Sequence, residues 1–242
     1  MIGIIGAAGV AATNRLCELI EERVVKAGGF RDCHHPEMII WQATQVPSRS
    51  MYLEGRGKSF IPGYVEVGRK LKACGCNELC MCCNTAHYYI DELEKEIGLP
   101  IINLIVEVGK IVKVTGAKRA GLMCGDGLAK VKFYDSIFAK VCPGVEIVYP
   151  TEEYQKIVTR GICNAKNMKR YKDVTDPSNP AWCFAEVTKH LITRGADCVI
   201  AGCTDINNVF ECSYDILDGV AYIDSLEVLA DCIASRKEYL PK

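Results

Sequence analysis

Short apolar runs alternate with helical segments along the chain, and this alternation constrains the fold more than any other feature of the sequence. Between these runs, apolar residues recur at the spacing of one helix face. Strands that alternate with helices at this pitch form βαβ units, with parallel strands and right-handed crossovers. The sequence therefore predicts an α/β fold. The predicted strands are 2–6, 37–43, 78–82, 101–103, 119–124, 145–149, 197–201 and 220–223. Among the predicted helices, one spans 129–141, and the last begins near 225 and runs to about 239.

Two cysteine motifs lie where a predicted strand gives way to a helix. Residues 82–87 read CCNTAH and follow one apolar run, and residues 201–205 read AGCTD and follow another. Parallel α/β sheets form their ligand sites at the carboxyl ends of strands, opposite helix N-termini. The chain therefore reads as two halves, each with one cysteine turn, and predicts one site with a thiol from each half.

The two motifs contain the groups that proton transfer at carbon requires. A thiol at such a turn lies near backbone N–H groups and the positive end of a helix dipole, which stabilise a thiolate. Two thiols on opposite walls of a cleft suit this chemistry, because one takes a proton while the other gives one to the opposite face. We therefore interpret Cys83 and Cys203 as an acid–base pair. Asn84, Thr85 and Thr204 offer hydrogen-bond donors to a carboxylate or a developing enolate.

Fifteen cysteines are many for 242 residues, and most are expected to be buried, reduced thiols. The crowding between positions 74 and 83 does not predict a metal site, because strand alternation points Cys80 and Cys82 to one face and Cys83 to the other. Cys124, at another strand end, is a weaker candidate for catalysis. The glycines near the N-terminus are spaced differently from a dinucleotide fingerprint, so no nucleotide cofactor is predicted.

Composition excludes several classes of function. The formal net charge of −1 gives no case for binding nucleic acid or an anionic membrane surface. No apolar run approaches the roughly 18 to 20 residues that span a bilayer. The N-terminus lacks a basic segment ahead of its apolar run, so no secretory signal is expected and the predicted compartment is the cytoplasm.

Two irregular segments are expected to serve the site. Residues 44–63 form a long, polar, glycine-rich stretch, and loops of this length are often functional. Within it, Arg49 lies near Pro47 at a strand exit and suits bidentate binding of a carboxylate. Residues 164–180 are basic and carry prolines, which predicts an exposed loop or lid. His87 is expected to orient its own turn.

The motifs resemble those of the aspartate/glutamate racemase family, cofactor-independent enzymes in which two cysteines shuttle the α-proton. Residues 83–87 are identical to the family's C-N-T-A-H motif, and 202–205 are similar to G-C-T-E, with Asp for Glu. Residues 6–13 resemble G-G-x-G-P-x-A-T, and 47–49 resemble the segment whose arginine holds a distal carboxylate. The resemblance covers essentially the whole chain.

The resemblance implies two similar parallel-sheet α/β domains that face each other across an active-site cleft. Residues 1–103 with 224–242 would form the first domain and 104–223 the second. Cys83 and Cys203 would be the catalytic pair, with Thr13 and Arg49 among the substrate-binding residues. The resemblance further implies no pyridoxal phosphate or other cofactor, no metal, and a homodimer.

One stretch departs from the family pattern. Residues 121–128 read GLMCGDGL in place of G-L-L-A-T-x-G-T, so Gly125 and Leu128 lack the hydroxyls that help to bind a carboxylate. The predicted function is racemisation of aspartate, glutamate or a related acidic amino acid. Two alternatives stay open: cis–trans isomerisation of a dicarboxylate such as maleate, and a ligand-binding protein that kept the fold without turnover.

Overall fold

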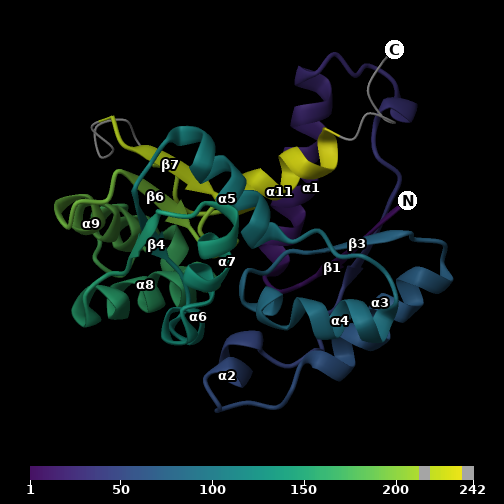
Figure 1. Ribbon diagram of the computed structural model, residues 1–242, viewed down its shortest axis with the longest axis horizontal. Helices are drawn as coiled ribbons and strands as arrows, with labels where there is room; N and C mark the ends of the chain where they lie inside the picture. The colour runs from purple at the N-terminus through teal and green to yellow at the C-terminus, as the bar shows by residue number, and fades with distance from the viewer. Residues whose placement is uncertain (213–218, 236–242) are drawn as a thin grey trace. The chain divides into compact units, whose positions relative to one another are not determined.

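The structure is a computed structural model that describes residues 1–212 and 219–235. The chain divides into two compact units (Figure 1). The first comprises Met1–Leu104 and the stretch that begins at Leu226, and the second comprises Ile105–Ser225. No helix within the described ranges is both long and apolar enough to span a membrane.

The sheet of the first unit is parallel, in the order β2-β1-β3. Its strands are β1 (Ile2–Gly6), β2 (Met38–Gln42) and β3 (Glu78–Met81), and Ile2 aligns with Met38 on one side and Glu78 on the other. The central strand is buried at all five positions, which explains its unbroken apolar sequence.

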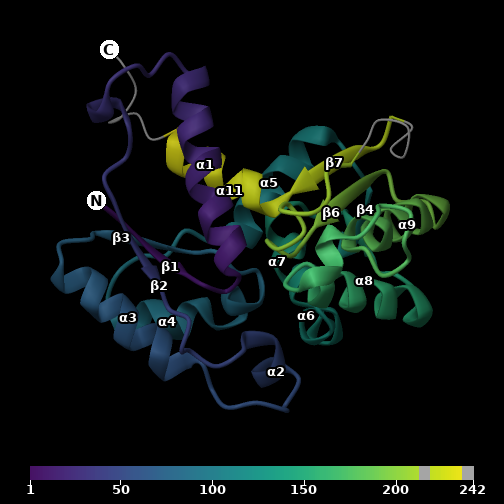
Figure 2. The ribbon, with the colours of Figure 1, turned by 180° about the vertical axis from the view of Figure 1, so that it is seen from behind.

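Helices cover both faces of this sheet (Figures 1 and 2). Helices α3 (Ile61–Ala73) and α4 (Ile90–Ile97) lie together on one face, and α1 (Val10–Lys26) and α11 (Ser225–Ala234) lie on the other. Arg23 joins α1 to α11 through hydrogen bonds of 2.8 Å to both Asp231 and Glu227. The short helices of this unit are η1 (Asp32–His34), α2 (Arg49–Leu53) and η2 (Thr85–Tyr89).

A glycine allows the close approach of α3 to α4. A Cβ atom at Gly68 would lie 2.4 Å from Cδ1 of Ile97, which is closer than side chains pack. The first turn of α3 lies at the carboxyl edge of the sheet, because α3 runs back from the end of β2 toward the start of β3. This edge is where the first cysteine motif lies.

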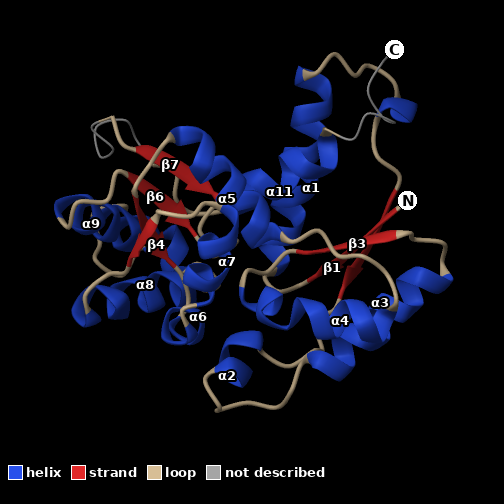
Figure 3. Ribbon diagram, in the orientation of Figure 1, coloured by secondary structure: helices blue, strands red, loops and turns tan. Residues whose placement is uncertain are grey.

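The second unit also holds a parallel sheet, in the order β5-β4-β6-β7, with helices packed around it (Figure 3). Helix α9 packs against β4 and β6 and against α8, and Gly109 of α5 contacts Phe138 and Val141 of α7. The strands are β4 (Arg119–Met123), β5 (Glu146–Val148), β6 (Cys198–Ala201) and β7 (Ala221–Asp224). The helices are α5 (Leu104–Thr115), α6 (Asp126–Val131), α7 (Phe133–Val141), α8 (Glu152–Asn164), η3 (Met168–Tyr171) and α9 (Pro180–Thr193).

The predicted fold class, two parallel-sheet α/β domains, is confirmed. Three local predictions were wrong. Residues 101–103 do not form a strand; Ile101 makes only an isolated bridge to Leu79. The helix predicted for 129–141 is two helices, because Lys132 adopts a left-handed conformation with φ of 50°. The stretch 44–63 is not wholly irregular, because Ser48 accepts a hydrogen bond from the Met51 N–H and caps α2.

The last helix was predicted to run to about residue 239. The described part ends at Ala234, and residues 236–242 lie outside the described ranges.

Candidate active site

In the first unit, Cys83 lies just beyond the carboxyl end of β3. Cys80 and Cys82 are fully buried, whereas Cys83 is half-buried and packs partly against the core of this unit. The N–H of Cys82 still bonds to β1, 3.4 Å from the carbonyl oxygen of Ile5, whereas Cys83 lies in the turn beyond the strand. Of these three thiols, Cys83 is the one that a ligand at the sheet edge can reach.

His87 holds the turn that carries Cys83. The imidazole is fully buried, with Nδ1 2.7 Å from the carbonyl oxygen of Cys83 and Nε2 3.2 Å from that of Ile102. Burial lowers the pKa of His87, so the ring is neutral at pH 7. A neutral imidazole carries one N–H, and the shorter contact favours donation from Nδ1 to Cys83. His87 therefore orients the cysteine turn through the backbone, as its position in the sequence predicts.

The polar residues of the CNTAH motif differ in burial. Asn84 is 2% exposed, and Thr85 is half-buried at the start of η2. Thr13 is buried; its hydroxyl donates to the carbonyl of Gly9 at 3.1 Å and accepts from the N–H of Ala7 at 3.0 Å. Thr13 thus stabilises the turn between β1 and α1, and its contact with a substrate stays a prediction.

Arg49 begins helix α2 and is half-buried in the same unit. Its Nη1 donates to the carbonyl oxygen of Pro47 at 3.2 Å, and its Cζ lies 5.9 Å from the centre of the Tyr64 ring. A guanidinium held by a carbonyl and an aromatic ring keeps a fixed direction, which suits bidentate recognition of a carboxylate.

In the second unit, Cys203 follows β6 and is half-buried, and the next two residues are almost fully buried. The Cys203 thiol donates to Oδ2 of Asp205 over 3.9 Å, and Lys166 Nζ lies 2.8 Å from the same oxygen. One carboxylate oxygen thus joins the thiol to an ammonium group. Thr204, a predicted donor to the substrate, is 2% exposed.

Lys166 was not among the predicted site residues. The residue lies in the basic segment 164–180, where one lysine among several gives no local signal of a partner 39 positions away. Only the folded chain brings it to Asp205.

The stretch that departs from the family pattern carries an acid, Asp126, between Gly125 and Leu128, which stand at the threonine positions. Oδ1 of Asp126 accepts hydrogen bonds from Thr159 at 2.6 Å and Gln155 at 2.9 Å, so its direction is fixed. Leu128 is buried and offers no hydrogen bond. The neighbouring Cys124 is fully buried, and burial raises its pKa, which keeps it a neutral thiol.

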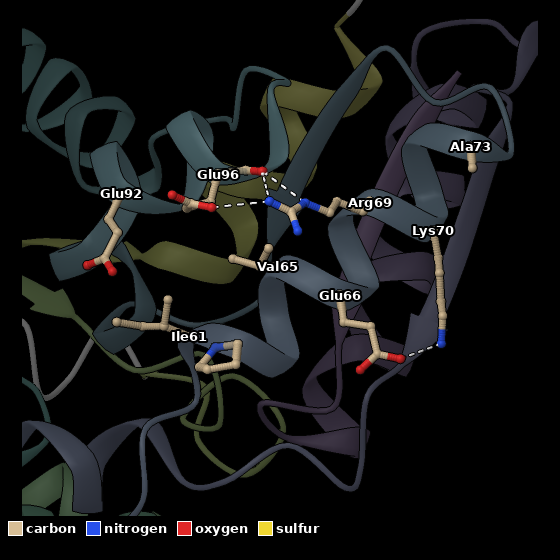
Figure 4. Close-up of a pocket in the computed structure, with 9 residues that line it drawn as sticks. Ile61, Val65, Glu66, Arg69, Lys70, Ala73, Glu92 and Glu96 are labelled. Atoms are coloured by element: carbon tan, nitrogen blue, oxygen red, sulfur yellow. Dashed lines mark hydrogen bonds and ion pairs between the residues drawn. The ribbon is translucent and has the colours of Figure 1, made fainter.

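A hollow of about 620 Å³ lies on the first unit between α3 and α4 (Figure 4). Four of its charged groups pair with one another, Arg69 with Glu96 at 3.1 Å and Lys70 with Glu66 at 2.6 Å. Neither a thiol nor an imidazole lines it. The hollow therefore lacks the groups for proton transfer that the cysteine turns supply. Within the described ranges, no cluster of three His, Cys, Asp or Glu side chains could hold a metal ion.

Taken separately, both units place a half-buried thiol at the carboxyl end of a parallel strand, beside buried polar side chains. This defines a class of α/β proteins with a cysteine at a strand end in each of two parallel-sheet units. The family model described as Asp/Glu/Hydantoin racemase matches residues 2–233, so the chain belongs to this family of enzymes. The family resemblance of the motifs is thereby confirmed.

Known proteins of similar sequence or fold agree with this assignment. The broad specificity amino-acid racemase RacX of Bacillus subtilis is 24% identical over 240 residues, covering 97% of both chains. The fold is shared with the aspartate racemase of Picrophilus torridus, with a TM-score of 0.77, 22% identity and coverage of 98% of this chain and 96% of that one. Glutamate racemase RacE1 of Bacillus anthracis matches with a TM-score of 0.63 and 15% identity, over 97% of this chain and 80% of that one.

Proposed function

We propose that this protein racemises an acidic amino acid without a cofactor, and that Cys83 and Cys203 are its two acid–base groups. The observation that supports this most is the selective exposure of thiols at strand ends. Cys82 and Cys124 also lie at strand ends but are fully buried, whereas Cys83 and Cys203 are half-buried and reach solvent. A general base or acid must reach the substrate, and partial exposure favours Cys83 and Cys203 over the two buried thiols.

In the proposed reaction, the thiolate of one cysteine takes the α-proton and becomes a thiol. The electron pair of the C–H bond passes into the α-carboxylate, which acquires enolate character. The thiol of the other cysteine then gives its proton to the opposite face of the α-carbon and becomes a thiolate. Protons and electrons balance, and the reverse reaction uses the same groups with their roles exchanged.

Asp205 and Lys166 are the charged groups that act on the Cys203 thiol in this reaction. The Asp205 carboxylate accepts a hydrogen bond from the Cys203 thiol and so fixes the direction of its proton, and Lys166 compensates the charge of that carboxylate. When Cys203 becomes a thiolate, the same ammonium group also stabilises the new negative charge. Lys166 therefore serves both protonation states of the thiol.

The acidic preference rests on Arg49, whose guanidinium suits a distal carboxylate. The related RacX is described as a broad specificity amino-acid racemase, and the structural relatives as aspartate and glutamate racemases. These descriptions support an amino acid as the substrate class. The family resemblance also leads us to propose a homodimer. Because both thiols must be reduced for this chemistry, we further propose that the enzyme works in the cytoplasm.

The test compares single Cys→Ser variants with matched controls. The wild type is incubated with a panel of L-amino acids that includes aspartate and glutamate, and D-enantiomers are measured by chiral chromatography. Cys83→Ser and Cys203→Ser should each lower the rate at least a hundredfold, within the usual contribution of about 10² to 10⁴ for an acid–base group. Cys33→Ser and Cys163→Ser change exposed thiols outside both turns and should keep the wild-type rate.

Three results would contradict the proposal. Full activity of either Cys83→Ser or Cys203→Ser would remove the two-thiol mechanism. Conversion of maleate to fumarate without racemisation would favour the dicarboxylate isomerase. Activity on neither the amino acids nor maleate would favour a binding protein.

A further inference from the structure

Tyr64 carries a hydroxyl that the folded chain leaves without a hydrogen-bond partner among the described residues. The side chain is 0% exposed, so bulk solvent does not reach the hydroxyl. Leaving a buried hydroxyl unsatisfied costs about 1 to 3 kcal/mol, and most buried polar groups avoid this cost. A phenylalanine would fill the same space without the penalty. A hydrogen-bond partner of the Tyr64 hydroxyl is therefore expected in a bound molecule.

The position of Tyr64 indicates where that partner binds. Tyr64 lies in the first turn of α3, at the carboxyl edge of the sheet in the first unit. The Arg49 guanidinium lies over its ring, and Cys83 packs against the core cluster to which Tyr64 belongs. The unsatisfied hydroxyl thus belongs to the same edge as a proposed catalytic thiol and a proposed carboxylate-binding arginine.

The hydroxyl stays protonated at neutral pH. Burial raises the pKa of Tyr64 far above its ordinary value, the charge of Cys83 raises it further, and that of Arg49 opposes the shift. A neutral phenol without a hydrogen-bond partner can donate its O–H proton to an acceptor.

An anion with several acceptor lone pairs fits this arrangement best. A carboxylate accepts a bidentate pair of bonds from a guanidinium and still has lone pairs for a further donor. We infer that the Tyr64 hydroxyl donates a hydrogen bond to the same substrate carboxylate that Arg49 binds, which makes Tyr64 a substrate-binding residue of the Cys83 half-site. The inference deepens the proposed function and rests on it for the choice of an acidic amino acid.

The experiment measures binding apart from turnover. The probe is 2-methylaspartate, which keeps both carboxylates and the ammonium of aspartate but has no α-hydrogen to transfer. Its affinity for the wild type, Tyr64→Phe and Tyr89→Phe is determined by isothermal titration calorimetry. Tyr89 is the matched control because it lies in the same aromatic cluster, with its ring 5.7 Å from that of Phe60, as Tyr64 does at 5.0 Å.

The expected result is a dissociation constant at least tenfold weaker for Tyr64→Phe and unchanged for Tyr89→Phe. The midpoint of thermal unfolding of Tyr64→Phe should equal or exceed that of the wild type, because the substitution removes an unsatisfied buried hydroxyl. This combination separates ligand binding from a structural role, which would lower the midpoint and leave affinity unchanged.

Either of two outcomes overturns the inference: equal affinity of the wild type and Tyr64→Phe, or no binding of the probe to the wild type. The proposed function fails separately. If 2-methylaspartate binds in a Tyr64-dependent way but the wild type exchanges no α-proton from any amino acid, the binding role stands and racemisation is refuted.

Discussion

Removing Lys166 should destabilise the protein more than removing its ion-pair partner Asp205. The Asp205 side chain is 6% exposed, whereas that of Lys166 is 49% exposed. Lys166→Met leaves a carboxylate almost fully buried without its cation, whereas Asp205→Asn leaves an ammonium group that water already reaches. Removing one partner of a fully buried pair costs about 3 to 5 kcal/mol, and a surface pair is worth about 0 to 1 kcal/mol.

Because only one partner of this pair is buried, Lys166→Met should lower the free energy of unfolding by about 2 kcal/mol, between these limits. Asp205→Asn should lower it by about 1 kcal/mol or less. The double variant should resemble Asp205→Asn, because it has no uncompensated buried charge. Lys189→Met is the matched control, since both side chains of its 2.9 Å pair with Glu186 reach solvent, at 55% and 33% exposed.

The assay is urea unfolding at pH 7.5, supported by thermal unfolding, where about 2 kcal/mol corresponds to roughly 4 to 8 °C for a chain of this size. The control should change stability by less than about 0.5 kcal/mol. Equal losses for Lys166→Met and Asp205→Asn, or additive losses in the double variant, would refute the account of Asp205 as a buried charge compensated by Lys166.

Arg49→Lys should lower kcat/KM for acidic substrates at least tenfold, about 1.4 kcal/mol, because lysine lacks the planar fork of arginine. Arg56→Lys, at an exposed position in the same loop, is the control. An unchanged kcat/KM for Arg49→Lys would remove the argument for an acidic substrate. Burial lowers the pKa of His87, so the unfolded chain binds a proton near pH 6.5 and the folded protein binds it only at lower pH. The free energy of unfolding should therefore fall as pH drops below about 6.5. His87→Gln should flatten this dependence between pH 7.5 and 5 in urea titrations, whereas His34→Gln, in an exposed turn, should not; equal slopes would contradict the role of His87.

Much of the architecture could be predicted from the sequence because strand and helix periods are local signals. The apolar run at 2–6 and the helical spacing that follows it correspond to β1 and α1. The break at Lys132 could not be predicted, since a left-handed lysine has no signature in a single sequence. The strand predicted at 101–103 failed because an apolar triplet satisfies a strand pattern without pairing beyond one bridge.

The candidate site was predictable in its thiols and not in their surroundings. Motif and position select Cys83 and Cys203 as candidates, and both are half-buried in the structure. The contact between Lys166 and Asp205 is non-local, and the helical period alone marks Tyr64 as a core residue. An unsatisfied hydroxyl becomes visible only when every neighbour of the ring is placed.

The central claim is that two thiols act on opposite faces of one α-carbon, and solvent exchange tests it most directly. Pure D- and L-aspartate are incubated separately in deuterated water with Cys83→Ser and with Cys203→Ser, and loss of the α-proton signal is followed by NMR. Each variant should incorporate deuterium into the one enantiomer that presents its α-proton to the surviving thiol, without inversion, and the two variants should prefer opposite enantiomers. Preference of both variants for the same enantiomer, or racemisation by either at the wild-type rate, would contradict the account.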